Sequence, residues 1–263
     1  YSLANRLDAV GATSEANPIY KEGTGHPVLS TAPAALLIDY SFFRKIDLTN
    51  GLPTDTNDNA SDFYFVDTQA TSAGAGQRLG APAPENLSGP MQRNGTLKLT
   101  LIDLGCAGSG PVPPPATPNA CARQRDLTAG SPTTSTFGTL SIRRKVTNFT
   151  GGFVTRLRFR AVDTTTFPPP AGVADLRLLT SGAFTADLAG GGTVEIQGLT
   201  LEEDTTAPNG GQPLGGGFNS TVSAGTINLA TPLAPGASIN VHFLLGVQQG
   251  GSFRFFVNVE ALP

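Results

Sequence analysis

The sequence predicts an all-β protein: an immunoglobulin-like or jelly-roll β-sandwich with an N-terminal strand or arm and a smaller, turn-rich β region. The main indication is alternation, because every second side chain is apolar in residues 157–161 and 253–259, as in a strand with one buried face. Composition agrees with this. Only 14% of the residues are charged, and the chain holds 32 glycines and 21 prolines, which disfavours long surface helices and favours strands joined by turns.

Three zones follow one another along the chain. Residues 1–50 are predicted to form an N-terminal arm or strand segment, residues 51–93 a turn-rich β region around one strand at 62–66, and residues 94–263 the β-sandwich domain. Strands separated by Gly, Pro and Thr turns are expected throughout the sandwich. They are predicted at 95–104, 137–148, 153–163, 173–187, 193–202, 219–230, 236–248 and 251–261.

Two connections in the sandwich are predicted to be hairpin turns. Residues 148–152 have the sequence Asn-Phe-Thr-Gly-Gly, and residues 248–251 have the sequence Gln-Gln-Gly-Gly. Short polar segments with glycine between two alternating runs are typical of β-hairpins. The two strands that flank each turn are therefore expected to be neighbours in one sheet.

Net charge and hydropathy exclude several partners. The chain has a net charge of −3 and a pI near 5.4, so it lacks the overall positive charge that nucleic-acid binding favours. Its longest apolar runs fall well short of the roughly 20 residues that a membrane-spanning helix needs. With 39% hydrophobic residues, the chain still has enough apolar side chains for a core in one or two domains. We expect a folded protein with no nucleic-acid partner and no membrane-spanning segment.

Two cysteines, Cys106 and Cys121, flank a loop rich in proline and glycine. We expect them to form a disulfide, which by the chain-entropy estimate stabilises a loop of this size by about 3 kcal/mol. Free thiols are the alternative, and metal ligation is less favoured because neither histidine is near in sequence. A disulfide favours an extracellular or cell-surface location. The start at Tyr1 instead of Met favours a processed chain, although a trimmed chain would start in the same way.

The sequence contains no catalytic signature. Gly-x-Ser-x-Gly, His-Glu-x-x-His and Gly-Lys-Ser/Thr motifs are absent, and there is no Trp to line a sugar-binding groove. His26 lies in a Gly-Thr-Gly-His-Pro turn. His242 alternates with Val241 and Phe243, so its side chain is expected to point outward from a strand. We expect no enzymatic activity and, apart from calcium, no cofactor.

The segment 55–62 carries hard oxygen ligands at alternating positions, a pattern that suits Ca²⁺. The candidate ligands are Asp55, Asn57, Asn59 and Asp62. The segment departs from an EF-hand, because Ala60 replaces its glycine and Val66 stands where its bidentate Glu belongs. Asx residues that cap a tight turn explain the pattern at least as well. Both interpretations remain open.

Basic side chains alternate on either side of the 148–152 turn. They are Arg143, Lys145, Arg156, Arg158 and Arg160. If that turn is a hairpin, several of them share one outward face, where they would need carboxylate partners. Those partners would come from Glu202, Glu203 and Asp204, from a neighbouring subunit or from an acidic glycan. Nucleic acid is disfavoured because no aromatic side chains are interleaved on that face.

Several stretches resemble the C-terminal region of large, uncharacterised secreted bacterial surface proteins. They are residues 139–160, 174–177, 214–220, 233–241 and 253–263. The Val-Thr-Asn-x-Thr-Gly-x-x-Val-Thr pattern at 146–155 is also similar to the immunoglobulin-like repeats of bacterial cell-surface proteins. The resemblance covers roughly residues 80–263. It implies an exported β-sandwich and supplies no catalytic residue.

Two hypotheses of function follow. The first is an extracellular structural protein, a subunit that assembles with copies of itself into a bacterial surface filament, pilus-like fibre or layer by exchange of an N-terminal strand. Its interaction residues would be Val28, Leu29, Leu36, Leu37, Ile38, Phe42 and Phe43. The alternative is a secreted adhesin or glycan-binding module that uses the basic strand face for acidic glycans. The segment 28–43 has a simpler interpretation too, as an edge strand of its own domain.

Overall fold

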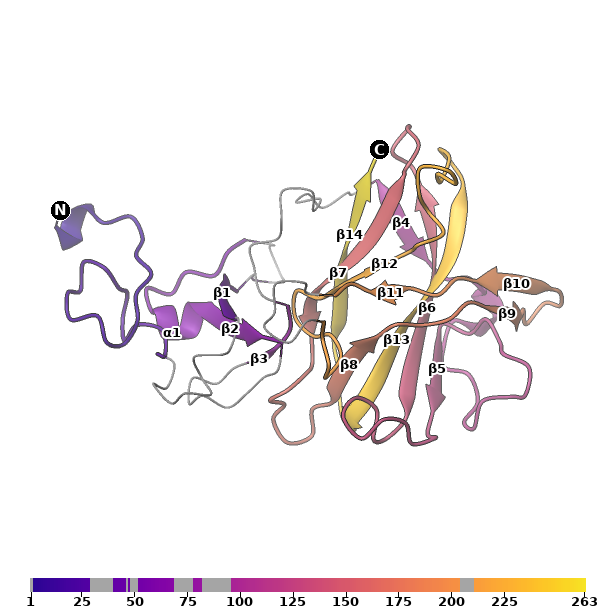
Figure 1. Ribbon diagram of the computed structural model, residues 1–263, viewed down its shortest axis with the longest axis horizontal. Coiled ribbons are helices and arrows are strands. Elements are labelled where there is room, and N and C mark those ends of the chain that lie inside the picture. Colours follow the sequence, from indigo (N-terminus) through magenta and orange to yellow (C-terminus); the bar gives the residue numbers. More distant parts are fainter. Residues whose placement is uncertain are drawn as a thin grey trace.

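The computed structural model describes residues 2–28, 40–45, 47, 52–68, 78–81, 96–203 and 211–263 (Figure 1). This part of the chain is nearly all β, which confirms the predicted fold class. Its helical turns are η1 (Leu3–Asn5), α1 (Asn59–Asp62) and η3 (Leu104–Cys106). Its strands are β1 (Tyr40–Arg44), β2 (Phe63–Asp67), β3 (Arg78–Leu79), β4 (Leu97–Thr100), β5 (Arg123–Asp126), β6 (Thr139–Asn148), β7 (Arg156–Thr164), β8 (Asp175–Leu179), β9 (Phe184–Asp187), β10 (Thr193–Ile196), β11 (Thr200–Leu201), β12 (Thr221–Ser223), β13 (Ser238–Gln249) and β14 (Phe255–Leu262).

Two antiparallel sheets make up the sandwich. One has the order β4-β6-β13-β8. β5 pairs with the same side of β6 as β4 does, but β5 lies beside the start of β6 and β4 beside its end. The other has the order β11-β12-β7-β14. The long strands β6, β13, β7 and β14 run through the lobe that carries the C-terminus in Figure 1. Each sheet has two edges: β11 and β14 in one, and β8 and the broken β4/β5 pair in the other.

The core lies between these sheets and follows the alternation of the sequence. On β7, Leu157, Phe159 and Ala161 are fully buried in the core, whereas Arg158 between them faces away from it. Phe159 meets Phe243 of β13 edge to face, with ring centroids 5.1 Å apart. Burying one such side chain contributes roughly 1.5–3 kcal/mol. The predicted period-two pattern of β7 is confirmed.

A smaller lobe at the N-terminal end contains α1 and a three-stranded sheet (Figure 1). β1 pairs antiparallel with β2, and β2 pairs parallel with β3. β3 leads into the sandwich, where the backbone of Gly80 pairs with that of Phe218. A Cβ at Gly80 would lie 2.1 Å from the Phe218 carbonyl oxygen, so only glycine permits this approach. The predicted arm and the turn-rich region thus contribute strands to one sheet.

Both predicted hairpins are wrong. Residues 148–152 connect β6 to β7, and residues 248–251 connect β13 to β14, but in each case the two strands belong to opposite sheets. The first crossing is held by Asn148, whose Nδ2 donates to the carbonyl oxygens of Gly152 and Leu233. A short Gly-containing turn reverses the chain in either arrangement, and burial of the apolar faces decides which strands pair.

Two predicted strands are broken in the structure. The strand expected at 173–187 divides into β8 and β9, and the strand expected at 193–202 divides into β10 and β11. β9 and β10 pair with each other and extend away from the sandwich lobe, and the segment after β10 bridges to β13 through Gln197 and Val241. β5 was not predicted, because its sequence Arg-Gln-Arg-Asp has no apolar alternation. Phe184 at the start of β9 lies over His242 of β13 and Arg143 of β6, so this end of the β9–β10 pair covers part of the outer face of that sheet.

Candidate functional site

The predicted basic ladder lies on β7 and is paired with carboxylates. Arg158 Nη2 lies 2.6 Å from Glu202 Oε2, and Arg158 Nη1 lies 3.5 Å from Glu260 Oε2. Arg160 Nε lies 2.6 Å from Glu260 Oε1, and Arg156 Nη2 lies 3.4 Å from Glu202 Oε1. Glu202 is a predicted partner. Glu260 was missed, because its place opposite Arg158 depends on the pairing of β14 with β7.

The other two predicted members of the ladder are on the opposite sheet. Arg143 and Lys145 belong to β6, so the prediction that they share a face with the β7 arginines is wrong. Arg143 is only 5% exposed, and it donates to Asn119 Oδ1 over 3.0 Å with its guanidinium over the Phe184 ring. Burial lowers the pKa of Arg143 to about 10. Arg143 is therefore part of the packing beneath the β9–β10 pair.

His242 points outward from β13, as predicted, but its side chain is not exposed to solvent. Phe184 of β9 covers it edge to face, and it is 6% exposed. One ring nitrogen, Nε2, lies 2.7 Å from the Gly182 carbonyl oxygen, and Nδ1 lies 3.2 Å from Ser141 Oγ. Burial lowers the pKa of His242, the hydrogen bond to Gly182 opposes that shift, and the charge of Arg143 adds to it.

The four predicted calcium ligands do not converge as a set. Asn59 is fully buried, and its Oδ1 accepts hydrogen bonds from the backbone amides of Gly11 and Glu22. Asn57 has a left-handed backbone, and Asp55 Oδ1 accepts from its amide in an Asx turn. The turn-capping interpretation therefore fits Asp55 and Asn57, whereas Asn59 joins α1 to the segments around Gly11 and Glu22.

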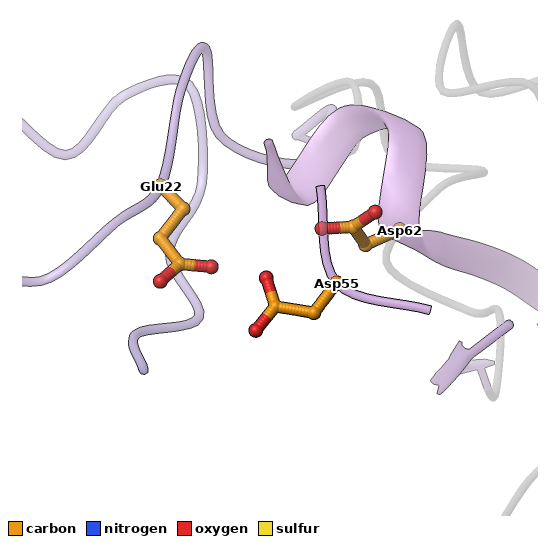
Figure 2. Close-up of side chains that lie close together, drawn as sticks. All are labelled: Glu22, Asp55 and Asp62. Carbon is orange, nitrogen blue, oxygen red and sulfur yellow. The ribbon is translucent and has the colours of Figure 1, made fainter. Parts of the chain in front are cut away.

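Asp55 and Asp62 meet a third carboxylate instead. Figure 2 shows Glu22 directed toward Asp55, with Asp62 of α1 beside it, and one oxygen from each of the three lies within 4.8 Å of the others. The amide and hydroxyl of Thr56 donate to Asp62; burial alone would raise the pKa of Asp62, but these bonds hold it below its ordinary value. Nothing in the local sequence pattern indicates that Glu22 belongs here.

Glu22 is the least satisfied member of this cluster. It is 2% exposed, and its Oε2 has no hydrogen-bond partner in the part of the chain that the structure describes. Its Oε1 lies 3.4 Å from Arg6 Nη2. Burial, followed by the negative charges of Asp8 and Asp55, raises the pKa of Glu22.

The predicted N-terminal interaction residues are divided. Phe42 and Phe43 belong to β1, where Phe42 stacks on Phe65 with centroids 5.1 Å apart and Phe43 meets Phe218 edge to face. Val28 is 45% exposed. Four further predicted residues lie outside the described residues: Leu29, Leu36, Leu37 and Ile38.

The predicted disulfide between Cys106 and Cys121 is present. It ties η3 to the segment that leads into β5, and the chain on both sides of it forms one wall of a groove. The groove has a volume of about 340 Å³ and lies at the open edge of the sandwich. Its lining residues come from both sheets: Leu99, Ala107, Ala122, Arg123, Ile142, Arg144, Phe243, Phe253, Phe255 and Val257.

Arg144 gives this groove its chemical character. It occupies an inward-facing position of β6, between Ile142 and Val146 in the alternating pattern, both of which belong to the core. Burial, and then the charge of Arg123, lowers the pKa of Arg144. Neither arginine forms an ion pair with any described residue. The groove thus combines apolar side chains with a half-buried Arg144, which donates to the Ala122 carbonyl oxygen, and an exposed Arg123.

Comparison with known proteins gives no relative. No protein-family model, no curated protein and no solved structure matches the chain. Among the described residues, no helix is long and apolar enough to cross a membrane. The interpretation of the site therefore depends on its geometry and chemistry.

Proposed function

We propose that this protein is an extracellular structural protein without catalytic activity, a subunit that assembles with copies of itself into a surface filament, pilus-like fibre or layer. The observation that carries the proposal is the open edge of the sandwich. There the edge strand β14 faces the broken β4/β5 edge across the apolar groove. The Cys106–Cys121 disulfide supports the extracellular part, because such bonds persist in oxidising compartments.

The edge is suited to strand addition. Among the described residues β14 pairs only with β7, so one side of its backbone is available for the hydrogen bonds of an added strand. Phe256 on β14 is 49% exposed, and Phe253 and Phe255 line the groove beside it. Main-chain hydrogen bonds would supply affinity in this arrangement, and the groove would select alternate apolar side chains.

The proposed donor is residues 28–39 of a neighbouring copy. Its sequence, Val-Leu-Ser-Thr-Ala-Pro-Ala-Ala-Leu-Leu-Ile-Asp, is apolar and ends in one carboxylate, that of Asp39. That carboxylate would complement Arg144 and Arg123 in the groove. β1 begins at Tyr40 and is paired in its own sheet, so the donor would end before it. A donor and an acceptor at different places on one subunit give a head-to-tail contact, which builds open filaments when it does not close into a ring.

The adhesin alternative, in which the basic strand face binds acidic glycans, has less support. It needs guanidinium groups that are available to a ligand, whereas Arg158 and Arg160 form ion pairs with Glu202 and Glu260. Arg143 and Lys145 lie on the other sheet. Arg156 is the most exposed arginine of the β7 ladder, so Arg156→Ser tests this alternative. If the variant still binds an acidic polysaccharide, the glycan site lies elsewhere than the basic strand face.

Size-exclusion chromatography and negative-stain electron microscopy of the native protein test the proposal. We expect polymers that are lost when residues 28–39 are deleted. Arg144→Asp should also abolish assembly, and combining it with Asp39→Arg should restore it by exchanging the two charges. Lys145→Asp is the matched control, because Lys145 is adjacent on β6 but faces away from the groove. A monomeric native protein, or polymers unaffected by Arg144→Asp, would overturn the proposal.

A further inference from the structure

Three carboxylates of the N-terminal lobe come together from separate segments. Glu22 lies at the turn around residues 22–24, Asp55 in an extended segment and Asp62 at the end of α1 (Figure 2). One oxygen of each lies within 4.8 Å of the others. Two oxygen ligands on opposite sides of one Ca²⁺ lie at most about 5 Å apart, because Ca–O distances are roughly 2.3–2.6 Å. The spacing therefore suits a single ion.

Glu22 supplies a second, independent observation. An ionised carboxylate that is 98% buried needs partners for both oxygens, because an unsatisfied buried polar group costs on the order of 1–3 kcal/mol and a charged one more. The Oε1 atom has a weak ion pair with Arg6, and Oε2 has no hydrogen-bond partner among the described residues. The carboxylate points toward Asp55, itself negatively charged (Figure 2). A cation between them would satisfy the unpartnered oxygen.

The local charges agree with a divalent ion. Three ionised carboxylates and the guanidinium of Arg6 sum to −2, and the nearby Asp8 is already paired with Arg44 over 2.7 Å. We propose that Glu22, Asp55 and Asp62 form a Ca²⁺ site in the N-terminal lobe. This set differs from the one expected from sequence, because Asn57 and Asn59 are replaced by Glu22.

Hydrogen bonds connect the segments that carry the three carboxylates. Asn59 Oδ1 accepts from the Glu22 amide over 3.0 Å, and the Asn59 amide donates to the Glu22 carbonyl oxygen over 3.1 Å. Glu22 is thereby fixed to the start of α1, and Asp62 is at the end of the same helix. Asp55 is exposed, which gives an ion and its waters access from solvent. Three carboxylates so close together favour Ca²⁺ over Mg²⁺, which keeps more of its water and accepts fewer protein ligands.

Calcium titration of the full-length, EDTA-treated protein tests the site, with isothermal calorimetry for affinity and hydrogen exchange for location. Extracellular calcium modules bind at about 10⁻⁴–10⁻³ M, so the titration should span that range. We expect Ca²⁺ to protect amides of residues 20–26 and 55–62, and Mg²⁺ at equal concentration to protect them less. Glu22→Gln should weaken Ca²⁺ binding at least tenfold.

Glu15→Gln is the matched control, because Glu15 is a partly exposed carboxylate of the same lobe that accepts from the Asn17 amide outside the cluster. It should bind Ca²⁺ as the unmodified protein does. If Glu22→Gln unfolds the lobe without calcium, the exposed ligand is tested instead by Asp55→Asn. Absence of Ca²⁺-dependent protection in the unmodified protein, or an unchanged affinity in a folded Glu22 or Asp55 variant, would overturn the proposal.

Discussion

Two clusters of buried charge differ in a way that separates architecture from function. In the sandwich, each oxygen of Glu202 and Glu260 lies within 3.5 Å of a guanidinium nitrogen of β7. In the N-terminal lobe, three carboxylates share the single guanidinium of Arg6, and one buried oxygen of Glu22 has no hydrogen-bond partner among the described residues. In the sandwich cluster, Glu260 Oε2 and Arg158 Nη1 form no hydrogen bond among the described residues but lie 3.5 Å apart as an ion pair, so positive and negative charges are matched. The lobe cluster lacks such a match, because its carboxylates outnumber its guanidinium groups.

The groove differs from the lobe in the sign of its unpaired charge, which is positive. Arg144 points toward the core side of its sheet with no carboxylate opposite it among the described residues, although the chain as a whole is acidic. A charge balanced by its own chain needs no ligand, while an unbalanced buried charge indicates what is missing. By this criterion the lobe, with the buried Glu22, suits a cation. The groove meets it in part, since Arg144 is half-buried and Arg123 exposed, and suits an apolar strand with a carboxylate.

The largest effect is expected from breaking the sandwich cluster. Glu260→Ala should lower the free energy of unfolding by about 3–5 kcal/mol, because it removes the carboxylate that pairs with Arg160 and the second of the two carboxylates beside Arg158, which keeps Glu202. Urea denaturation followed by circular dichroism measures this. Glu22→Gln in calcium-free buffer should cause no comparable loss, because it removes an uncompensated charge. Equal losses in the two variants would refute the distinction between the clusters.

A control separates loss of pairing from loss of volume. Combined replacement of Arg160 by Met and Glu260 by Leu removes both charges of the 2.6 Å pair and should cost far less than Glu260→Ala alone, since apolar pairs of similar volume often replace buried ion pairs without loss. A double variant as unstable as the single one would assign the effect to packing.

The second largest effect should come from the disulfide, which borders the groove. Cys106→Ser with Cys121→Ser opens a loop of sequence separation 15 and should cost about 3 kcal/mol by the chain-entropy estimate. Ala107 and Ala122 lie next to the two cysteines and line the groove. Loss of assembly is therefore expected with loss of stability. A stable double variant that no longer assembles would separate the two roles.

Local periodicity predicted what each strand buries but not which strand it pairs with. The alternation of Leu157 and Phe159 predicted the core face of β7, and the presence of two cysteines predicted the disulfide between them. The turn at 148–152 gave no indication that it crosses between sheets, because the same residues suit both connections. The basic ladder was therefore predicted with the correct alternation but with two residues on the wrong sheet.

The candidate sites were harder to predict for the same reason. Glu22 joins Asp55 and Asp62 only through the folding of the N-terminal lobe, and no spacing rule links residues so far apart. Arg144 in the run Leu-Ser-Ile-Arg-Arg-Lys-Val stands at a position where the alternation requires an apolar side chain. That exception is a signal available from sequence, although it does not say what the arginine faces.

A smaller, local effect is expected from the residue that frames the lobe cluster. Asn59→Ala leaves the Gly11 and Glu22 amides and the Ala9 carbonyl oxygen without their partner, at about 1–3 kcal/mol for a buried unpaired group. Hydrogen exchange should quicken in residues 9–24 and stay unchanged in β6 and β13. Asn17→Ala, which removes an exposed cap of Ile19, should change neither region. Faster exchange throughout the sandwich would mean that the two lobes unfold together.

The smallest effect should be a pH dependence from His242. Its pKa is lowered in the folded protein by burial and by Arg143, despite the hydrogen bond to Gly182, so folding favours the neutral imidazole. The contribution of the neutral imidazole to the free energy of unfolding is fully present above the unfolded pKa of about 6.5. It is lost as the pH falls from about 6.5 through the lower pKa of the folded protein. Denaturation at several pH values should therefore show stability declining below about pH 6.5.

His242→Gln isolates this dependence, because a glutamine amide can donate to the Gly182 carbonyl oxygen but does not titrate. The difference in stability between the unmodified protein and the variant should decrease or change sign as the pH falls. The chain has two histidines, so NMR titration can follow the His242 imidazole separately, and its pKa should lie below the ordinary histidine value. A pH-independent difference would mean that His242 is uncovered in solution. The β9–β10 pair would then not be closed over β13, whereas a clear decline would place this cover among the completed parts of the fold.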